Sequence, residues 1–384
     1  MRPLYLDYNA TTPLDPRVFE AMRPYFLEDF GNSGSRTHVY GQRAKEAVDR
    51  ARQQVADLLG ARSDEILFTS GATESNNLVL LGLRRHGEAT GRKHVLATAI
   101  EHKAVLEPLD QLRAAGFEVE LLPVTTGGYV EPDTVKARLR PDTLLVSVMH
   151  ANNETGVLQP VREIAELLAD GKTFFHTDAA QTFGKEVEEL RGLHCDFLSI
   201  SGHKIYGPKG VGALYASRRR MQRRPLTPLL YGGGQEMGYR PGTLPVPLVV
   251  GLGEAAELGG REYRQRRKAA ARVKEEFLRE LAAVEHRING DPSRTQAHVV
   301  NVSFPGVDSE ALMMAVREEL AFSNGAACTT ATYLPSHVLE AMGLNKDDIE
   351  SAVRISWGPG VTALPAKLLM TVIQGMKGLI GRSP

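Results

Sequence analysis

Short apolar runs alternate with stretches of helical spacing through residues 65–215, and this alternation limits the possible folds more than any other feature. Each run has the length of a buried strand, and the intervening segments are long enough for a helix. Such a pattern favours a mostly parallel sheet with helices on both faces. We therefore expect an α/β fold, with strands at 65–69, 95–98, 144–149, 173–176, 197–200 and 211–215.

Polar residues follow the carboxyl ends of several of these strands. They include Glu101-His102-Lys103, the segment 150–156 and Asp178-Ala179-Ala180-Gln181. After the first strand, Ser70-Gly71-Ala72-Thr73 leads into a helix expected at 78–83, and this turn is either a seat for a phosphate or an ordinary capped helix. Open α/β sheets bind their ligands beyond the carboxyl ends of the strands, so we expect the functional site at that edge.

Lys204 lies in the segment 201–210, directly after the apolar run 197–200. Pro208 and the glycines of this segment predict a loop. A lysine beside a core strand can lose hydration and become a nucleophilic amine, able to form a Schiff base with an aldehyde cofactor. The alternative for Lys204 alone is a solvated loop lysine.

The composition excludes several classes of protein. The 46 basic and 46 acidic side chains balance, which gives no indication of direct nucleic-acid binding. No apolar run is long enough to cross a membrane, and the N-terminal residues lack the apolar core of a signal peptide. Cys195 and Cys328 are the only cysteines, too few for a disulfide framework or a four-cysteine zinc site. We therefore expect a cytoplasmic protein.

The rest of the chain predicts a second, smaller α+β domain. A charged helix at about 261–284 leads to a strand at 299–304, a helix at 309–319 and a strand near 353–358. We expect a large domain of residues 15–260, and a small domain formed by residues 1–14 and 261–384.

Three further features have competing interpretations. Gly251-Leu252-Gly253-Glu254-Ala255-Ala256 fits a dinucleotide-binding pattern, but no βαβ unit surrounds it and helix packing is the better interpretation. The basic run Arg218–Arg224 is either a solvated loop or a patch for an acidic partner. Cys328 lies among small residues, where a thiol can be exposed and reactive, whereas Cys195 lies against an apolar run.

Three polar residues also need an interpretation. Asp178 is a helix cap or a carboxylate that holds a cationic ring nitrogen. His102 follows a strand and is by itself best interpreted as a satisfied core histidine. Arg354 is a surface charge or a bidentate clamp for a carboxylate.

Taken together, the motifs resemble the NifS/IscS-type cysteine desulfurases, which are class V members of the aminotransferase superfamily and use pyridoxal 5′-phosphate (PLP). The matching stretches run from Leu6 to Arg354. They are Leu-Asp-Tyr-Asn-Ala-Thr-Thr at 6–12, Ser-Gly-Ala-Thr-Glu-Ser at 70–75, Glu-His-Lys-Ala-Val at 101–105, Asn-Asn-Glu-Thr-Gly at 152–156 and Ser-Gly-His-Lys-Ile-Tyr-Gly-Pro-Lys-Gly at 201–210. The resemblance implies the PLP-dependent transferase fold type I.

The resemblance also implies a cofactor site. Lys204 would carry the cofactor as a Schiff base, Asp178 would pair with the ring nitrogen, and His102 would stack on the ring and move protons. Gln181 would contact the ring hydroxyl. The phosphate would be bound by Ala72, Thr73, Ser201, His203 and, from the other subunit of a homodimer, Thr243.

The substrate implied by the resemblance is L-cysteine. Asn153, which also belongs to the cofactor site, would hold its carboxylate together with Arg354. Cys328 would attack its sulfur, leaving alanine and a persulfide for a sulfur-acceptor protein. The rival functions are another class V enzyme, such as a selenocysteine lyase or an aminotransferase, and a non-catalytic sulfur carrier.

Two segments depart from the common family pattern. Arg354-Ile355-Ser356-Trp357-Gly358-Pro359 stands where many members have Arg-Phe-Ser-Leu-Gly-Arg. Ser323-Asn324-Gly325-Ala326-Ala327-Cys328 stands where housekeeping members have Ser-Ser-Gly-Ser-Ala-Cys. With the residues that follow Cys328, this loop resembles the DndA-like branch, which supplies sulfur for DNA phosphorothioation. The alternative pathway for the sulfur is iron–sulfur cluster assembly.

Overall fold

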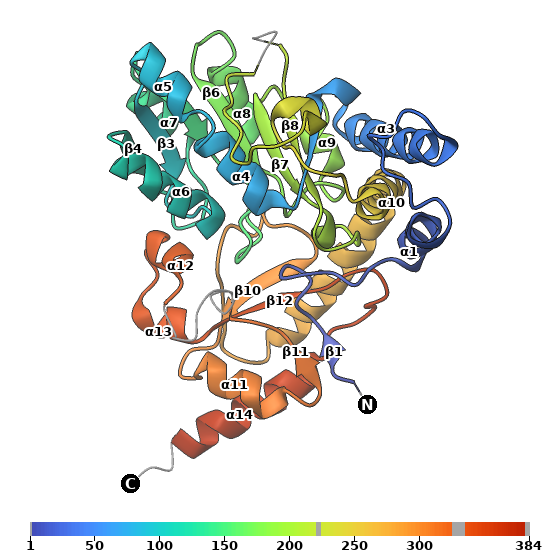
Figure 1. Cartoon of the computed structure of the whole chain (residues 1–384). Helices are drawn as coiled ribbons and strands as arrows, with labels where there is room; N and C mark the ends of the chain where they lie inside the picture. The colour runs from blue at the N-terminus through green and yellow to red at the C-terminus, as the bar shows by residue number, and fades with distance from the viewer. Residues whose placement is uncertain (1, 220–223, 325–334, 381–384) are drawn as a thin grey trace.

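The structure is a computed structural model of the 384-residue chain, and it describes residues 2–219, 224–324 and 335–380. Within these residues, a seven-stranded sheet forms the centre of the larger part of the molecule (Figure 1). The strand order is β2-β8-β7-β6-β5-β3-β4. The strands are β2 (Ile66–Thr69), β3 (His94–Thr98), β4 (Glu118–Leu122), β5 (Thr143–Ser147), β6 (Phe174–Asp178), β7 (Phe197–Ser201) and β8 (Gly212–Ala216).

The sheet is mixed but mostly parallel. Strand β8 is antiparallel to both of its neighbours, β2 and β7, and every other pairing is parallel. Because β2 and β7 flank the same antiparallel strand, they run in the same direction. The carboxyl ends of β2, β3, β5, β6 and β7 therefore lie along one edge of the sheet.

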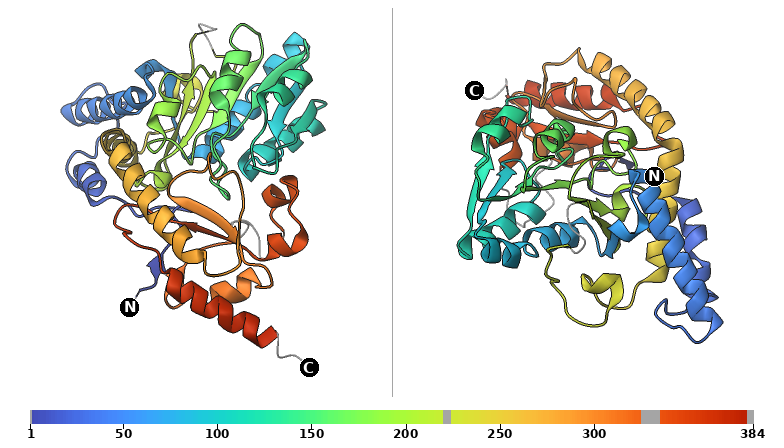
Figure 2. Two further views of the ribbon diagram at one scale, coloured as in Figure 1. Left: turned by 180° about the vertical axis from the view of Figure 1, so that it is seen from behind. Right: turned by 90° about the horizontal axis from the view of Figure 1, so that it is seen from above.

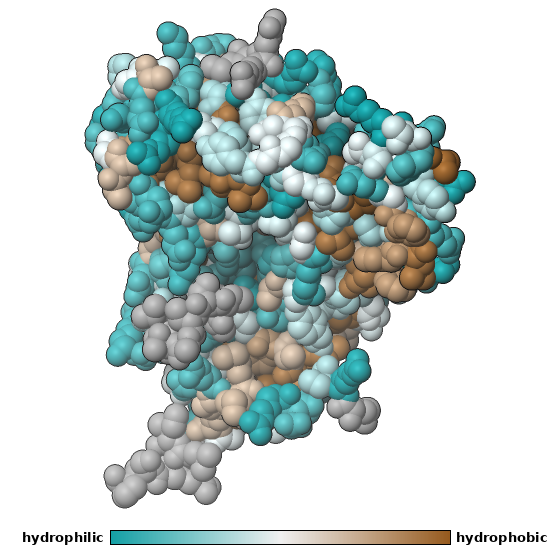
Figure 3. All heavy atoms as spheres, in the orientation of Figure 1, coloured by the Kyte–Doolittle hydropathy of each residue, from teal (hydrophilic) through white to brown (hydrophobic). Residues whose placement is uncertain are grey.

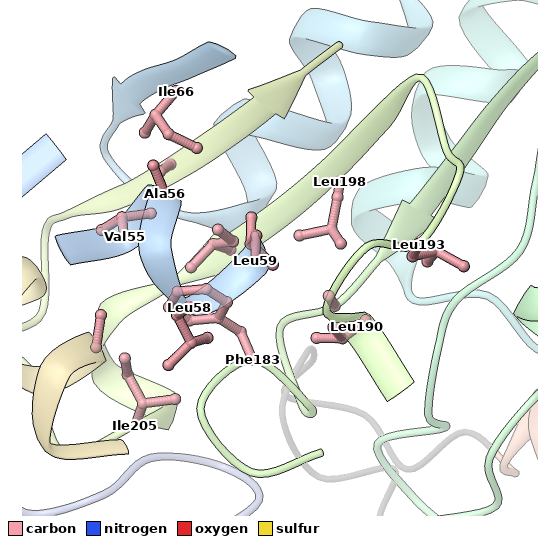
Figure 4. Packing of buried hydrophobic residues seen from close by; sticks show 14 of the residues in the cluster. Val55, Ala56, Leu58, Leu59, Ile66, Phe183, Leu190, Leu193, Leu198 and Ile205 are labelled. Atoms are coloured by element: carbon pink, nitrogen blue, oxygen red, sulfur yellow. The ribbon is translucent and has the colours of Figure 1, made fainter. Parts of the chain in front are cut away.

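Helices cover both faces of the sheet, and neighbouring residues of one strand belong to different hydrophobic clusters. In β2, Ile66 and Phe68 pack in the cluster with α3, while Leu67 packs in the cluster with α4 and α6. Figure 4 shows the first cluster, where Val55 and Leu59 of α3 lie near Ile66 and Leu198. This alternation has the period of two expected of a strand buried on both faces, and it confirms the predicted fold class.

Nine helices precede residue 200 in the described part of the chain. They are α1 (Pro16–Met22), α2 (Pro24–Leu27), α3 (Val39–Leu59), α4 (Ala72–Leu80), α5 (Arg84–Thr90), α6 (Lys103–Ala114), α7 (Pro132–Arg138), α8 (Val161–Leu167) and α9 (Val187–Leu190). Asp15 caps α1 by accepting a hydrogen bond from the backbone of Arg17.

The smaller part of the molecule has its own hydrophobic cluster and joins the larger part through α10 (Val246–Leu281), which runs along both (Figure 2). Strands β9 (Arg287–Ile288), β10 (Val299–Ser303) and β12 (Ala352–Ser356) form an antiparallel sheet. Strand β1 (Leu4–Tyr5) pairs with β11 (Leu320–Ala321). The helices here are α11 (Ser309–Val316), α12 (His337–Ala341), α13 (Lys346–Glu350) and α14 (Ala366–Ile380).

The structure corrects several predicted bounds. Helix α4 begins at Ala72 and not at residue 78, because Gly71 caps it directly after the strand. Helix α10 begins at Val246, so the predicted domain boundary at 260/261 falls inside a continuous helix. Strand β4 was not predicted, since its alternating charged residues occupy a sheet edge. None of the described helices has the length and apolar content needed to cross a membrane.

The glycines of the segment 251–256 serve helix packing, as the sequence indicated. A Cβ atom at Gly253 would lie 2.6 Å from Ala51 Cα of α3, and one at Gly251 would lie 2.6 Å from Met22 Sδ. Helices α3 and α10 therefore approach more closely than any larger residue at 253 would permit.

Candidate active site

The side chains predicted for the cofactor site gather at the edge where the parallel strands end. Asp178 is the last residue of β6, Ser201 is the last residue of β7, and His102 caps α6 after β3. Lys204 follows β7 in a turn of 3-10 helix. The parallel sheet thus brings together residues that are up to about a hundred positions apart in the sequence.

Asp178 is buried and held by two hydrogen bonds. Asn76 Nδ2 of α4 donates to Asp178 Oδ2 at 2.7 Å, and the backbone N–H of Ala180 donates to Oδ1 at 2.9 Å. The carboxylate of Asp178 is therefore fixed in position and direction relative to the groups beside it.

Lys204 is oriented by the N-terminal segment. Its Nζ donates to the carbonyl oxygens of Asn9 and, at 2.9 Å, Ala10. Two residues later, Tyr206 has a φ of 66°, an unfavourable conformation for an aromatic residue. Its backbone N–H donates to Thr12 Oγ1, which also ties this turn to the N-terminal segment. Such local strain is common where a structure fixes a functional side chain.

His102 is held as a neutral imidazole. Its Nδ1 accepts a hydrogen bond from the backbone N–H of Ala104 at 3.0 Å, so the proton of the neutral ring is on Nε2. Burial lowers the pKa of His102, and the nearby charges of Asp178 and Lys204 act on it in opposite directions. The three groups therefore lie within electrostatic reach of one another. The preceding residue, Glu101, is fully buried, and burial raises its pKa to about 8.

The start of α4 has the features of an anion site. The first N–H groups of a helix, here at Ala72 and Thr73, have no acceptor within the helix. A Cβ atom at Gly71 would lie 3.8 Å from Ser201 Oγ, and one at Gly212 would lie 2.6 Å from Gly71 Cα. The end of β7 and the start of α4 are therefore in close contact, with Ser201 beside the helix N-terminus.

Two other predicted residues extend this region. His203 Nδ1 is 3.1 Å from Thr11 Oγ1. Gln181 is buried, and its Nε2 donates to the same Asn9 carbonyl that accepts from Lys204. The N-terminal segment thus connects both residues to the lysine.

Arg354 is almost completely buried in β12, and its guanidinium is partly paired. It donates to Asp7 Oδ1 at 2.6 Å and to the Asn153 carbonyl at 2.9 Å. Its Nε has no hydrogen-bond partner among the described residues. The side chain of Asn9 also donates to the Asn153 carbonyl, so the predicted carboxylate clamp adjoins the lysine through Asn9.

Two predicted residues are not placed in this cluster. Thr243 is exposed on the loop before α10 and makes no hydrogen bond to the other site residues within the described part of the chain. Cys328 lies outside the described residues. The second cysteine, Cys195, is buried, and burial raises the pKa of its thiol. This agrees with its prediction as a structural residue.

Four residues around the site were not assigned a role from the sequence: Asp7, Asn9, Asn76 and Glu101. Three of them bond to a predicted residue: Asp7 accepts from Arg354, the Asn9 carbonyl accepts from Lys204, and Asn76 donates to Asp178. Glu101 directly precedes His102 and accepts from Thr98 and Met149. The motifs at 6–12 and 101–105 contain Asp7, Asn9 and Glu101, and Asn76 directly follows the motif at 70–75, but no spacing rule indicates which side chains turn inward.

The basic run is divided by the structure. Arg218 pairs with Asp64 at 2.5 Å, and Arg224 is buried and donates to the carbonyl oxygens of Ala216 and Asp64. Residues 220–223 lie outside the described residues. The arginines at the two ends of the run therefore have structural partners.

Comparison with known proteins agrees with this geometry. The family described as "Aminotransferase class-V" matches residues 4–364. The chain belongs to the class-V aminotransferase family. It is 47% identical to "Cysteine desulfurase" from Homo sapiens over 93% of this chain and 78% of that protein. It is 47% identical to "Cysteine desulfurase IscS" from Anaeromyxobacter dehalogenans, over 93% of this chain and 88% of the relative.

Solved structures give the same result. The crystal structure of DndA from Streptomyces lividans has a TM-score of 0.82 and 48% identity, and the match covers 93% of this chain and 100% of DndA. These similarities confirm the family and the enzyme class predicted from the motifs of this chain.

Proposed function

We propose that this protein is a PLP-dependent cysteine desulfurase, which converts L-cysteine to L-alanine and leaves the sulfur on Cys328 as a persulfide. One observation carries the proposal: the amine of Lys204, the carboxylate of Asp178 and the ring of His102 meet at one sheet edge, beside the N-terminus of α4. The kinship with cysteine desulfurases supports the choice of substrate.

The donors at this edge fit PLP. The aldehyde needs an amine, which Lys204 supplies, and the cationic ring nitrogen needs an anion, which Asp178 supplies. The phosphate needs N–H donors, which the start of α4 supplies together with Ser201 and His203. When bound, the cofactor acts as an electron sink for the substrate carbon.

Each remaining residue has a task that follows from its contacts. Asn76 and the Ala180 N–H keep the Asp178 carboxylate in place. His102 holds a proton on Nε2, from which it can donate. Gln181 has a buried Oε1 without a hydrogen-bond partner among the described residues, and we assign it to the ring substituents. Arg354 and Asn153 would bind the substrate carboxylate.

The overall reaction is balanced without an external oxidant. The carbon–sulfur bond of cysteine breaks, and a sulfur–sulfur bond forms at the Cys328 thiolate. The released carbon gains a proton and becomes the methyl group of alanine. A sulfur-acceptor protein then takes the outer sulfur of the persulfide.

A homodimer and a particular sulfur pathway are parts of the same proposal. An apolar area lies over α1, α2 and the residues that follow them, visible at the right of Figure 3, where Phe26, Leu27 and Phe30 are more than half exposed. Exposed apolar side chains grouped in this way are typical of an interface. DNA phosphorothioation, supported by the similarity to DndA, and iron–sulfur cluster assembly, supported by the similarity to IscS, are the two candidate pathways. Location in the cytoplasm stays a prediction.

The test uses purified protein loaded with PLP and given L-cysteine without a reductant. We expect alanine to form and mass spectrometry to find one additional sulfur on Cys328. Cys328→Ser should still bind PLP and cysteine but form no persulfide, while Cys195→Ser, the matched control, should retain activity. A persulfide on Cys195, or alanine formation that continues over many turnovers in Cys328→Ser, would contradict the proposal.

A further inference from the structure

A second cavity lies outside the candidate active site, along the middle of α10. Its volume is about 520 Å³, within the range of small-molecule sites. It is lined by Arg17 of α1, one face of α10 between Glu262 and Val273, the loop 184–186, residues 205–206, residues 297–298 and the segment 357–362. Lys204, Asp178 and His102 do not line it. Figures 1 and 2 show the segment that follows β12 beside α10.

The walls of the cavity are mainly apolar. Ile205, Ala269, Val273, Trp357 and Val361 contribute side chains to it. The indole of Trp357 is 1% exposed, and its Nε1–H has no hydrogen-bond partner among the described residues. An unpaired buried donor is uncommon in a folded protein and is a reason to look for an acceptor from outside.

The polar groups in the cavity are concentrated around Lys185. Its Nζ lies 3.3 Å from His298 Nε2. The pKa of His298 is lowered well below its usual range by burial and by the charge of Lys185, so this ring is a neutral acceptor. A charged lysine has three N–H donors, and His298 takes one of them.

The charges of the lining favour an anion. Five basic side chains and two acidic ones line the cavity. Arg17 and Arg266 both pair with Glu262, at 2.5 and 2.6 Å, and Arg267 is 3.5 Å from Glu186. Among the described residues, neither Lys185 nor Arg272 has a carboxylate within ion-pair distance.

We propose that this cavity is a second binding site, for a small carboxylate that carries an apolar body. The carboxylate would pair with Lys185 and Arg267, and the apolar body would pack against Trp357 and the α10 side chains. Burial lowers the pKa of Lys185 to about 7, so a bound anion would restore its full charge. This proposal does not depend on the proposed function.

The segment that closes the cavity is one in which this chain departs from its family. Trp357-Gly358-Pro359 stands where many members have Leu-Gly-Arg. A Cβ atom at Gly358 would lie 2.3 Å from Tyr8 Cε1 and 2.7 Å from the Tyr206 hydroxyl, so the backbone here packs tightly against the rings.

The experiment uses a natural reporter, because Trp357 is the only tryptophan in the chain. Cyclohexanecarboxylate is titrated into the purified enzyme loaded with PLP while tryptophan fluorescence is followed, and calorimetry provides a second measurement. The matched ligands are cyclohexylmethanol, which has the body without the charge, and acetate, which has the charge without the body. We expect saturable binding of cyclohexanecarboxylate and much weaker binding of the other two.

Variants locate the site. Lys185→Met should weaken binding by roughly tenfold or more, and Arg267→Ala should weaken it less, because Arg267 is half exposed. Lys268→Met is the control, since Lys268 is exposed on α10 and does not line the cavity. Saturating L-alanine should leave the affinity unchanged.

Four results would overturn the proposal. They are the absence of saturable binding, equal binding of the neutral alcohol, unchanged affinity in both Lys185→Met and Arg267→Ala, and competition by L-alanine. The last would place the ligand in the candidate active site. A failure of the desulfurase reaction would leave this proposal standing, because binding is measured without turnover.

Discussion

The candidate active site and the cavity along α10 differ in how their polar groups are held. At the sheet edge, Asp178 receives two hydrogen bonds, Lys204 donates two and His102 accepts one, all with neighbours in the same chain. In the cavity, counting only partners in the described ranges, Lys185 has one polar contact and Trp357 Nε1 has none. One site is arranged before any ligand arrives, and the other has room and unused donors.

The difference indicates two kinds of task. Chemistry requires side chains fixed to within a fraction of an ångström, and the strand ends of a parallel sheet provide that. Reversible binding tolerates looser groups around a mainly apolar volume. Substitutions at the edge should therefore reduce turnover with little effect on folding, whereas those along α10 should affect stability or binding and leave turnover intact.

The largest effect is expected for Asp178→Asn. The amide cannot provide the negative charge that keeps a ring nitrogen protonated, so turnover should fall by about a hundredfold or more. The fold should persist, because the new amide oxygen can still accept from the Ala180 N–H, and a flip of the Asn76 amide lets its unpartnered Oδ1 accept from the new NH2 group. Steady-state alanine formation measures the first effect, and thermal unfolding measures the second. Turnover close to wild type would remove Asp178 from the mechanism.

The next effect concerns the residue that positions Asp178. Asn76→Leu keeps the volume but removes the hydrogen bond to the carboxylate, so turnover should fall by roughly ten- to a hundredfold. The visible spectrum of the bound cofactor should also shift its dependence on pH, which a loss of packing alone would not cause. Asn77→Leu is the control, because Asn77 lies on the same helix and bonds only to the Thr73 carbonyl. Equal losses in both variants would argue against a positioning role.

In helix α10 we expect a substitution to reduce stability and to leave turnover unchanged. Gly253→Ala would place a Cβ atom 2.6 Å from Ala51 Cα, and we expect a loss of about 1–3 kcal/mol in the free energy of unfolding. Turnover per folded molecule should be unchanged. Gly375→Ala in α14 is the control, because nothing lies within 4 Å of its added methyl group and alanine favours the helix. Denaturant unfolding measures the stability of both variants. Equal stability of Gly253→Ala and Gly375→Ala would refute the close approach of α3 and α10.

The candidate active site could be predicted largely from the sequence, whereas the cavity could not. Lys204, Asp178 and His102 each follow a strand, so a local pattern located them. Asn9 and Asp7 could not be assigned, because they reach the site only when β1 pairs with β11, more than 300 residues away. The cavity was not predicted at all, since six separate segments form it. Strand β8 was predicted as a strand, but its antiparallel direction was not. That direction depends on its pairing with both β2 and β7, which lie far from each other in the sequence.

The smallest effect is a dependence of stability on pH that originates in the cavity. Burial, with a contribution from Lys204, lowers the pKa of Lys185 to about 7 from its ordinary value of 10.5, while Glu186 opposes the shift. Between these two values the unfolded chain binds more protons at Lys185 than the folded chain. The contribution of Lys185 to stability therefore rises with pH across this window, by at most about 1.4 kcal/mol per pH unit.

The measurement is a comparison of urea unfolding for the wild type and Lys185→Met at several pH values from neutral to mildly alkaline. The stability of the wild type relative to the variant should increase with pH. The subtraction removes Lys274, whose pKa is lowered by burial alone, and the neutral-to-alkaline range avoids the titration of His298, whose pKa is lowered mainly by burial. A saturating carboxylate ligand should reduce this slope, because an anion beside Lys185 stabilises its charged form and raises its pKa. If the difference in unfolding free energy between the two proteins does not change with pH, Lys185 is solvated. The cavity would then not contain a desolvated lysine, and its contrast with the candidate active site would not hold.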